Sequence, residues 1–142
     1  MPRSRTNIDH LAVVPSGVYA IDTKRYRGRI QVRKPLFGAP SLLIAGRDRT
    51  KLVAGLHKQV DAVRAALAEI APEAPVRGCF CFVAPEGRLA DVGLPVLRTL
   101  EIDGFQLYRL RRLAKRLQRT GPLTAEQIEA LTAHLAQNFP SA

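Results

Sequence analysis

The sequence predicts a mixed α/β domain in which helices pack against a sheet. Three observations support this class: strand-like apolar runs near the N-terminus, a long helical repeat over residues 49–70, and a buried strand pattern over residues 76–83. The chain has 142 residues, of which 46% are hydrophobic, and this size suits one core. We therefore expect residues 1–142 to form a single domain, with residues 109–142 as its C-terminal helical part.

The first elements are predicted to be strands. Residues 8–14 are apolar and β-branched, residues 15–17 (Pro-Ser-Gly) supply a turn, and residues 18–24 form a second strand-like run. This pattern indicates a β-hairpin. Further strands are expected over residues 29–33 and, after several Pro and Gly breakers, over residues 42–45.

A long amphipathic helix is predicted next. Between residues 49 and 70 the apolar side chains recur at steps of three and four, and Asp48 is placed to cap the N-terminus. Pro72 and Pro75 end the helical pattern. The apolar run 76–83 that follows is typical of a central strand covered on both faces. It contains Cys79 and Cys81, which alternation places side by side as small core residues, without the geometry for a disulfide or enough ligands for zinc.

The C-terminal third predicts a hairpin and two helices. Asp103-Gly104 lies between the runs 97–102 and 105–108 and is a strong turn signal. A helix over residues 111–119 carries leucines on one side and a basic group on another. This group, Arg112, Lys115, Arg116 and Arg119, is either a second contact patch or a solvated helix face. Thr124 and Gln127 then form a capping box for a helix that runs to about Asn138.

The charge of the chain indicates a polyanionic partner. Lys and Arg total 22 against 12 Asp and Glu, so the formal charge is +10 and the pI is near 10.6. Nucleic acid is the commonest such partner, because each phosphate contact releases condensed counterions. A membrane partner is not expected, since no apolar run approaches the roughly 18–20 residues that span a bilayer and residues 1–5 lack a signal peptide's apolar core. We expect a cytoplasmic protein.

The first hairpin carries the residues that indicate chemistry. If Val14 pairs with Gly17, Asp9 falls opposite Asp22, and their like charges repel unless a cation lies between them. Lys24 shares a face with Asp22. Oxygen ligands of this kind suit Mg²⁺ or Mn²⁺, which can activate water and screen the charge on a phosphate, while the lysine stabilises developing negative charge. The pattern favours a phosphodiester hydrolase.

Two strings carry a family resemblance: NIDH at residues 7–10 and PSGVYAIDTKRYRG at residues 15–28. They resemble the nuclease-related domain family, called NERD, within the PD-(D/E)XK nuclease superfamily. The resemblance extends through residues 46–52, the helix with Gln59 and the strand around residue 82, and it weakens after about Pro85. It implies a restriction-endonuclease-like mixed sheet flanked by helices, and a metal-dependent nuclease that hydrolyses phosphodiester bonds in DNA.

The resemblance also implies residue roles. Asp9 and Asp22 would be acidic metal ligands, Thr23 would contribute its backbone carbonyl, Lys24 would be the catalytic lysine, and Gln59 would be an accessory residue. A basic set close to these residues is expected to contact nucleic acid, with DNA as the expected partner. It comprises Arg25, Arg27, Arg29, Arg33 and Lys34.

The chain departs from the family pattern at its start. Such domains ordinarily begin with a helix that supplies a glutamate to the site, and only eight residues precede Asp9. We therefore expect that helix to be lacking, because either the sequence begins within a longer protein and the domain is truncated at its N-terminus, or this is a degenerate copy. The alternative to a nuclease is a catalytically impaired nucleic-acid-binding module that retains the fold. A dimer is possible, because a missing helix would leave apolar sheet surface to cover.

Overall fold

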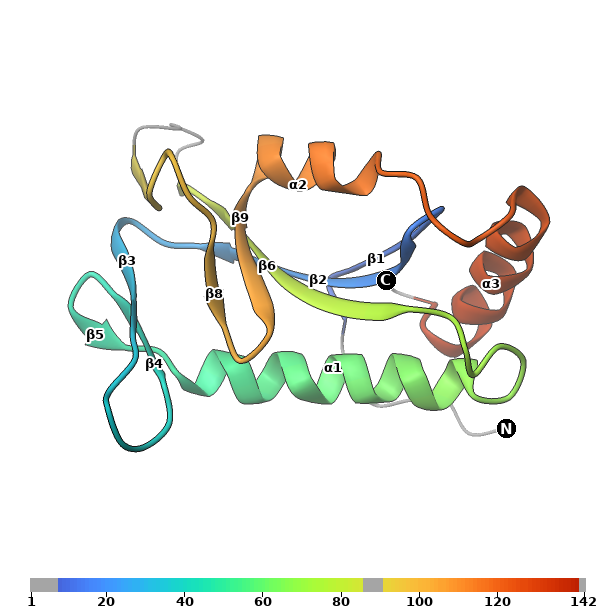
Figure 1. Cartoon of the computed structure of the whole chain (residues 1–142), viewed down its shortest axis with the longest axis horizontal. Coiled ribbons are helices and arrows are strands. Elements are labelled where there is room, and N and C mark those ends of the chain that lie inside the picture. Colours follow the sequence, from blue (N-terminus) through green and yellow to red (C-terminus); the bar gives the residue numbers. More distant parts are fainter. Residues whose placement is uncertain (1–7, 86–90, 141–142) are drawn as a thin grey trace.

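The computed structural model describes residues 8–85 and 91–140, and in these ranges it contains two mixed β-sheets and three helices (Figure 1). The larger sheet has the order β1 (His10–Val14), β2 (Gly17–Arg25), β6 (Val76–Val83), β9 (Phe105–Arg109), β8 (Leu100–Ile102). The smaller sheet has the order β5 (Arg47–Asp48), β4 (Ser41–Ile44), β3 (Gly28–Arg33), β7 (Val92–Gly93). The helices are α1 (Lys51–Leu67), α2 (Leu110–Leu117) and α3 (Ala125–Asn138). The predicted mixed α/β class is confirmed.

Strand β6 lies at the centre of the larger sheet, as its apolar run predicts. It pairs in parallel with β2 on one side and with β9 on the other, while antiparallel hairpin strands form both edges. The register of the first hairpin is also as predicted, because Val14 pairs with Gly17 and His10 with Ile21. The second hairpin turns at Asp103 and Gly104, which both have positive φ.

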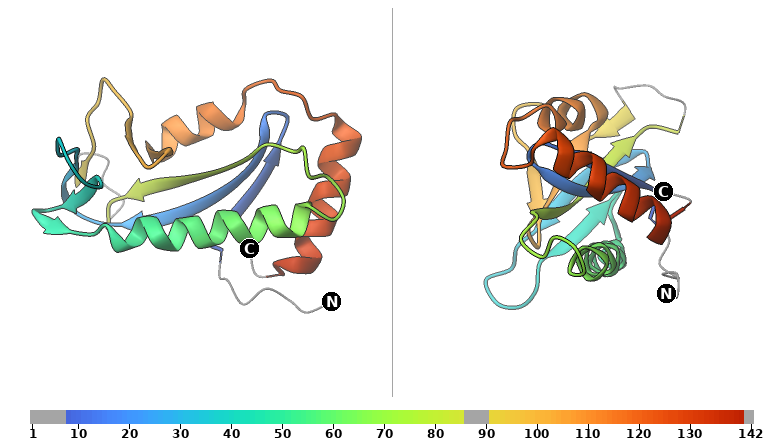
Figure 2. Two further views of the ribbon diagram at one scale, coloured as in Figure 1. Left: turned by 60° about the horizontal axis from the view of Figure 1, so that its bottom comes forward. Right: turned by 90° about the vertical axis from the view of Figure 1, so that its right-hand side faces the viewer.

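Helices cover both faces of this sheet (Figure 2). Side chains alternate along β2: Val18 and Ala20 join the core that includes the buried residues of α1, whereas Tyr19 and Ile21 pack in a smaller cluster with Leu113 of α2. Cys79 and Cys81 belong to the second cluster and are free thiols, and burial raises the pKa of Cys79 to about 12. The two cysteines are therefore small core residues, in agreement with their pattern.

The smaller sheet is the main difference from the sequence-based expectation of one sheet. Strands β3 and β4 form close to where they are predicted, but they pair with β5 and β7 rather than extending the larger sheet. The β3–β7 pairing requires glycine, because a Cβ atom on Gly93 would lie 1.9 Å from the Gly28 carbonyl oxygen. Such a pairing joins residues far apart in sequence, and periodicity alone does not reveal it.

The N-terminus of α1 differs from the prediction. Asp48 was expected to cap this helix, but it belongs to β5, and its Oδ1 accepts a hydrogen bond of 2.8 Å from the Thr50 N–H. Thr50 is the N-cap residue, and its hydroxyl accepts a bond from the Leu42 N–H instead of from the helix. The cap prediction was wrong because strand pairing takes Asp48 out of the helical segment.

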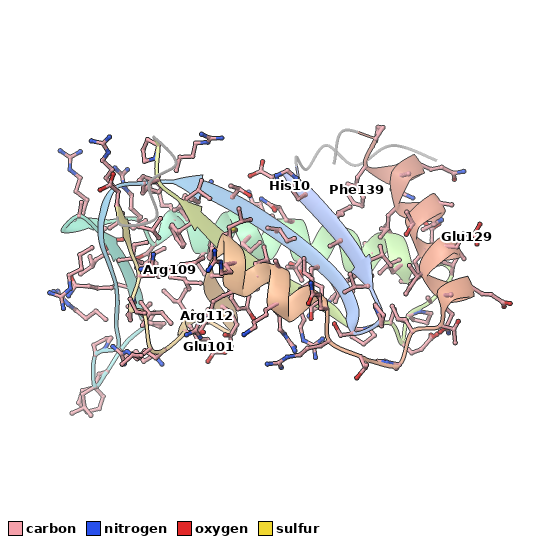
Figure 3. The ribbon with its side chains drawn as sticks, turned by 90° about the horizontal axis from the view of Figure 1, so that it is seen from above. His10, Glu101, Arg109, Arg112, Glu129 and Phe139 are labelled. Atoms are coloured by element: carbon pink, nitrogen blue, oxygen red, sulfur yellow. The ribbon has the colours of Figure 1, made fainter. Side chains whose placement is uncertain are left out.

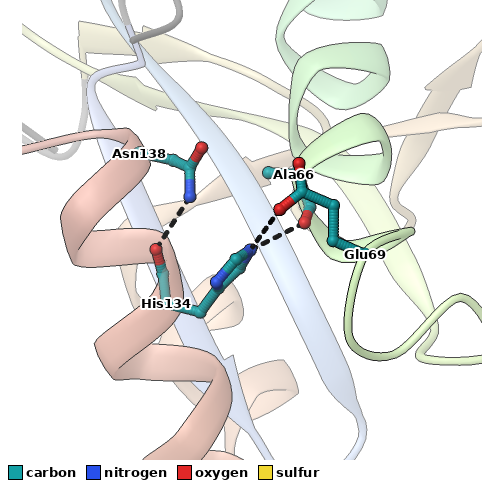
Figure 4. Close-up of polar contacts among 4 residues, drawn as sticks. All are labelled: Ala66, Glu69, His134 and Asn138. Carbon is teal, nitrogen blue, oxygen red and sulfur yellow. Dashed lines mark hydrogen bonds and ion pairs between the residues drawn. The ribbon is translucent and has the colours of Figure 1, made fainter. Parts of the chain in front are cut away.

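Helix α3 packs at the end of the sheet and joins α1 through His134 (Figure 4). The predicted capping box of Thr124 and Gln127 is present at its start. The His134 Nε2–H donates to the Ala66 carbonyl at 2.8 Å, and the Glu69 carboxylate lies 3.9 Å from the same nitrogen. No helix within the described ranges is long and apolar enough to cross a membrane.

Candidate active site

The candidate site lies on the α1 face of β2, near the C-terminal end of that strand. Since Val18 and Ala20 face the α1 side, the alternation of a strand places Asp22 and Lys24 there as well. Asp22 is only 4% exposed, and its Oδ1 lies 3.2 Å from the Nζ of Lys24. The strand therefore presents a buried carboxylate with a lysine ammonium in direct contact.

Asp9 lies next to this pair, just before β1. The hairpin ladder ends at the His10–Ile21 pair, and one further step in the same register brings Asp9 opposite Asp22. The Thr23 N–H donates a hydrogen bond of 3.2 Å to Asp9 Oδ2, so the Asp9 carboxylate is held against β2 beyond the end of the ladder. His10 pairs with Ile21 and therefore shares the opposite face of the hairpin.

The electrostatics of Asp22 are dominated by its burial. Loss of solvent raises the pKa of the Asp22 carboxyl above its ordinary value of 3.8, and Asp9 acts in the same direction. Lys24 lowers the pKa but does not reverse the shift. The negative charge of Asp22 is thus incompletely compensated by the described residues around it, and a further cation would stabilise it.

The donor set suits a hard divalent ion. Two carboxylates provide oxygen ligands, and the N–H and C=O of one strand residue point to the same side, so the Thr23 carbonyl lies on the side of Asp9. Among the described residues no group of three or more His, Cys, Asp and Glu side chains could hold a metal. An ion here would therefore take its other ligands from backbone, water or substrate, as Mg²⁺ commonly does.

Gln59 lies on α1, on the helix that covers the same face of the sheet. His57 points toward the β8–β9 hairpin, where it bonds Asp103, and residue 59 is about 200° further round the helix. Gln59 therefore lies on the side of α1 that faces away from the β8–β9 hairpin. Its Oε1 is buried and accepts no hydrogen bond from the described residues. A buried amide oxygen without a donor is costly for folding.

The basic set is exposed but not gathered in one place. Arg25 is the last residue of β2, directly after Lys24, and Arg27 and Arg29 follow around the entry to β3. Arg33 and Lys34 lie at the other end of β3, about 13–17 Å beyond Arg29 at the rise of an extended strand. The structure thus places three of the five beside the end of β2 and two well away from it.

One contact just beyond the end of β2 had no signal in the local sequence pattern. The Arg49 guanidinium lies over the ring of Tyr26, 5.4 Å from its centroid. The contact forms because β5 and the start of α1 return beside the β2–β3 connection, and no local pattern predicts a contact between residues so far apart.

The fold and this site together define a class. A mixed α/β domain of restriction-endonuclease-like type, with an acidic pair and a lysine at the end of a strand, belongs among the nuclease-like proteins. The family model of the nuclease-related domain, NERD, matches residues 1–83, which is more than half of the chain, and the chain therefore belongs to this family, usually placed in the PD-(D/E)XK superfamily.

The family match ends at Val83, the last residue of β6. Strands β7 to β9 and helices α2 and α3 lie beyond it. No curated protein and no solved structure is significantly similar to the chain. Membership suggests a nuclease-related function and nucleic-acid binding.

Proposed function

We propose that residues 1–142 form one nuclease-related domain that hydrolyses phosphodiester bonds in DNA with Mg²⁺ or Mn²⁺. The observation that carries the proposal is the grouping of Asp9, Asp22 and Lys24 at the end of β2, with an ion pair of 3.2 Å and a hydrogen bond of 3.2 Å holding them together. Buried charged groups of this kind are unfavourable for folding and cluster at functional sites.

Each residue has a distinct part in this proposal. Asp9, Asp22 and the Thr23 carbonyl would hold the divalent ion, which supplies positive charge to neutralise the phosphate and acidity to activate water. Lys24 is oriented by its contact with Asp22, and its ammonium would stabilise negative charge developing on the phosphate. The Gln59 amide would position a polar group of the substrate or a water molecule.

The DNA would approach across the basic set. Arg25, Arg27 and Arg29 lie nearest to the site and would contact the phosphates next to the cleaved bond, while Arg33 and Lys34 would contact the backbone further along. We also propose a cytoplasmic location, which suits the two free thiols.

The test is a cleavage assay with matched variants. Plasmid and linear DNA are incubated with the purified protein in Mg²⁺ or Mn²⁺, and Asp22→Asn and Lys24→Met are compared with Asp61→Asn, which removes an exposed carboxylate from α1. We expect cleavage by the wild type and by Asp61→Asn, and a loss of at least about 100-fold in the site variants. Equal cleavage by all four proteins would refute the assignment.

Metal binding has a readout that does not depend on cleavage. Mn²⁺ should raise the thermal midpoint of the wild type, because a ligand that binds only the folded state stabilises it. The increase should disappear in Asp9→Asn and Asp22→Asn and persist in Asp61→Asn. An increase that survives in both site variants would place the ion elsewhere.

A second candidate function is nucleic-acid binding without catalysis. The +10 charge favours it, together with a site in which only two carboxylates are brought together among the described residues. It predicts salt-dependent DNA binding by the wild type that is unchanged or strengthened in Asp22→Asn, with no cleavage in either metal. Detectable Asp22-dependent cleavage would exclude it.

A further inference from the structure

A second basic surface lies away from the candidate site. A groove of about 1350 Å³ runs between α2, the β8–β9 hairpin, the first half of β6 and α1, and we name it the α2 groove. Figure 1 shows the arrangement of these elements. Its lining comes from both faces of the sheet, with Tyr19 and Cys79 on the α2 face and Val60 and Phe105 on the α1 face, and it includes none of Asp9, Asp22, Thr23, Lys24 and Gln59. The α2 groove is therefore distinct from the candidate site.

The lining of the α2 groove is strongly basic. Among the described residues that line it, eight are Lys or Arg and two are Asp or Glu. One of the two acids, Asp103, is bonded to His57 at 2.6 Å, so its charge is partly balanced when that histidine is protonated. The basic residues are Arg64, Arg77, Arg109, Arg111, Arg112, Lys115, Arg116 and Arg119.

The charge pattern of α2 is unfavourable for the stability of this helix. Its eight residues include four Lys or Arg and no acid, and Arg111 and Arg112 occupy the first turn, where the helix dipole disfavours positive charge. Arg111 and Lys115 are also four residues apart, a spacing at which like charges repel. An ordinary solvated helix face interleaves both signs. This pattern therefore favours an anionic ligand over a merely solvated face.

Two of the arginines are built into the wall of the α2 groove. The Arg112 guanidinium donates to the Val96 carbonyl at 2.8 Å and to Thr99 Oγ1 at 3.2 Å, which ties α2 to the loop before β8 (Figure 3). Arg116 contacts Tyr108, where it lowers a phenol pKa that burial raises. Arg111, Lys115 and Arg119 are exposed along the same side. In the α2 groove, Arg112 and Arg116 are therefore held by contacts within the protein, whereas Arg111, Lys115 and Arg119 are exposed to solvent.

The shape and the lining identify the occupant. A bilayer surface is bound through a face of exposed apolar side chains, whereas among the described lining residues Val96 is the only large apolar side chain that is exposed. The Tyr and Phe rings that line it, Tyr19, Phe105 and Tyr108, are at most 8% exposed and offer no platform on which bases could stack. The His57 ring packs against Phe105 and is bonded to Asp103. The remaining feature of the lining is its row of Lys and Arg side chains, which suits the phosphates of a nucleic-acid backbone.

We propose that the α2 groove binds the sugar–phosphate backbone of nucleic acid without sequence preference, as a second contact surface. The proposal shares its class of partner with the proposed function, but it does not require the carboxylate site to be catalytic. Phosphate contacts alone give binding that is independent of sequence and steeply dependent on salt.

The first test measures affinity with the full chain in EDTA, so that cleavage does not interfere. Fluorescence anisotropy with a labelled DNA duplex compares Arg111→Gln/Lys115→Gln with Lys51→Gln/Lys58→Gln, which removes two exposed charges from α1. At about 100 mM salt the groove variant should bind at least about tenfold more weakly, and its plot of log affinity against log salt should be shallower by about 2. The α1 variant should change by less than about threefold. Equal losses in both variants would overturn the proposal.

The second test looks for a gain of affinity, which misfolding cannot imitate. Glu101 lies on the groove lining, whereas Glu129 lies on α3 at the other end of the molecule (Figure 3). Glu101→Gln should tighten DNA binding about two- to threefold, and Glu129→Gln should leave it unchanged. No gain in Glu101→Gln would overturn the proposal. So would a groove variant that loses binding to phosphatidylserine vesicles but not to DNA.

The outcomes separate this proposal from the nuclease assignment. Groove-dependent DNA binding in a protein that never cleaves DNA would overturn the nuclease assignment and support the groove. Asp22-dependent cleavage, together with equal DNA affinity in the groove and α1 variants, would support the nuclease assignment and overturn the groove proposal.

Discussion

Replacement of Asp22 by Asn is expected to stabilise the protein while abolishing the proposed activity. Asp22 is 4% exposed, and the carboxyl pKa is raised because burial outweighs the contact with Lys24. The folded state therefore holds its proton more tightly than the unfolded state does. Between pH 3.8 and the higher pKa of the folded state, stability falls as the pH rises. Asn keeps the shape of the side chain and removes the ionisation.

The expected gain is about 1 kcal/mol at neutral pH, within the range of about 0.5–2 kcal/mol typical of stabilising changes at functional sites. Unfolding entropy is about 2.1 cal/mol/K per residue, so a chain of 142 residues has about 0.3 kcal/mol/K. A gain of about 1 kcal/mol then raises the thermal midpoint by about 3 °C.

The assay is thermal unfolding followed by circular dichroism from about pH 7 down to about pH 4, in EDTA. The gain of Asp22→Asn over the wild type should be full at neutral pH and shrink as the pH falls through the folded-state pKa toward 3.8, because the Asp22 carboxyl of the folded protein is then protonated and that of the unfolded chain is becoming so. Asp61→Asn is the control, because Asp61 is exposed on α1. If Asp22→Asn lowers the midpoint at pH 7, the ion pair with Lys24 outweighs burial and the reasoning is wrong.

Three further changes test the packing around the site and the fold. Lys24→Gln should lower the free energy of unfolding by about 1–3 kcal/mol, since it leaves the buried Asp22 charge without its partner. In a double-mutant cycle measured by urea unfolding, the addition of Asp22→Asn should restore most of this loss. Gly78→Ala should cost about 1–3 kcal/mol in the same assay, because the new Cβ would lie 2.6 Å from Val60 Cγ2; a neutral result would show that α1 can move away. Thr124→Ala should cost about 1 kcal/mol and speed hydrogen exchange in α3, whereas unchanged exchange would show that the capping box contributes little.

The local parts of the fold could be predicted because short-range physics determines them. The 15–17 turn with alternating side chains fixes the register that opposes Asp9 and Asp22, and the hairpin ladder confirms that register up to His10. The central position of β6 follows from an apolar run that must be covered on both faces. The capping box of α3 is likewise a local pattern.

The remaining parts depend on contacts between distant segments. The smaller sheet requires β7 to pair with β3, more than 60 residues earlier in the chain, and neither strand's own pattern specifies that pairing. Burial of Asp22 depends on how α1 lies over β2, and the unsatisfied oxygen of Gln59 depends on the same packing. The roles of Asp9, Asp22, Thr23, Lys24 and Gln59 follow from the family resemblance and stay predictions.

Two regions of the described chain are unfavourable for stability, and each is part of a proposed functional surface. One is a buried aspartate on β2 whose pKa is raised, and the other is a helix with arginines in its first turn and no acid to balance them. Natural sequences tolerate such violations mainly where function requires them. Asp22→Asn should therefore stabilise the protein, and so should Arg111→Gln by a few tenths of a kcal/mol. Because each change should also weaken a function, the combination of higher stability with lost cleavage or lost DNA affinity separates a functional residue from a structural one. A residue kept only for folding would lose stability and function together.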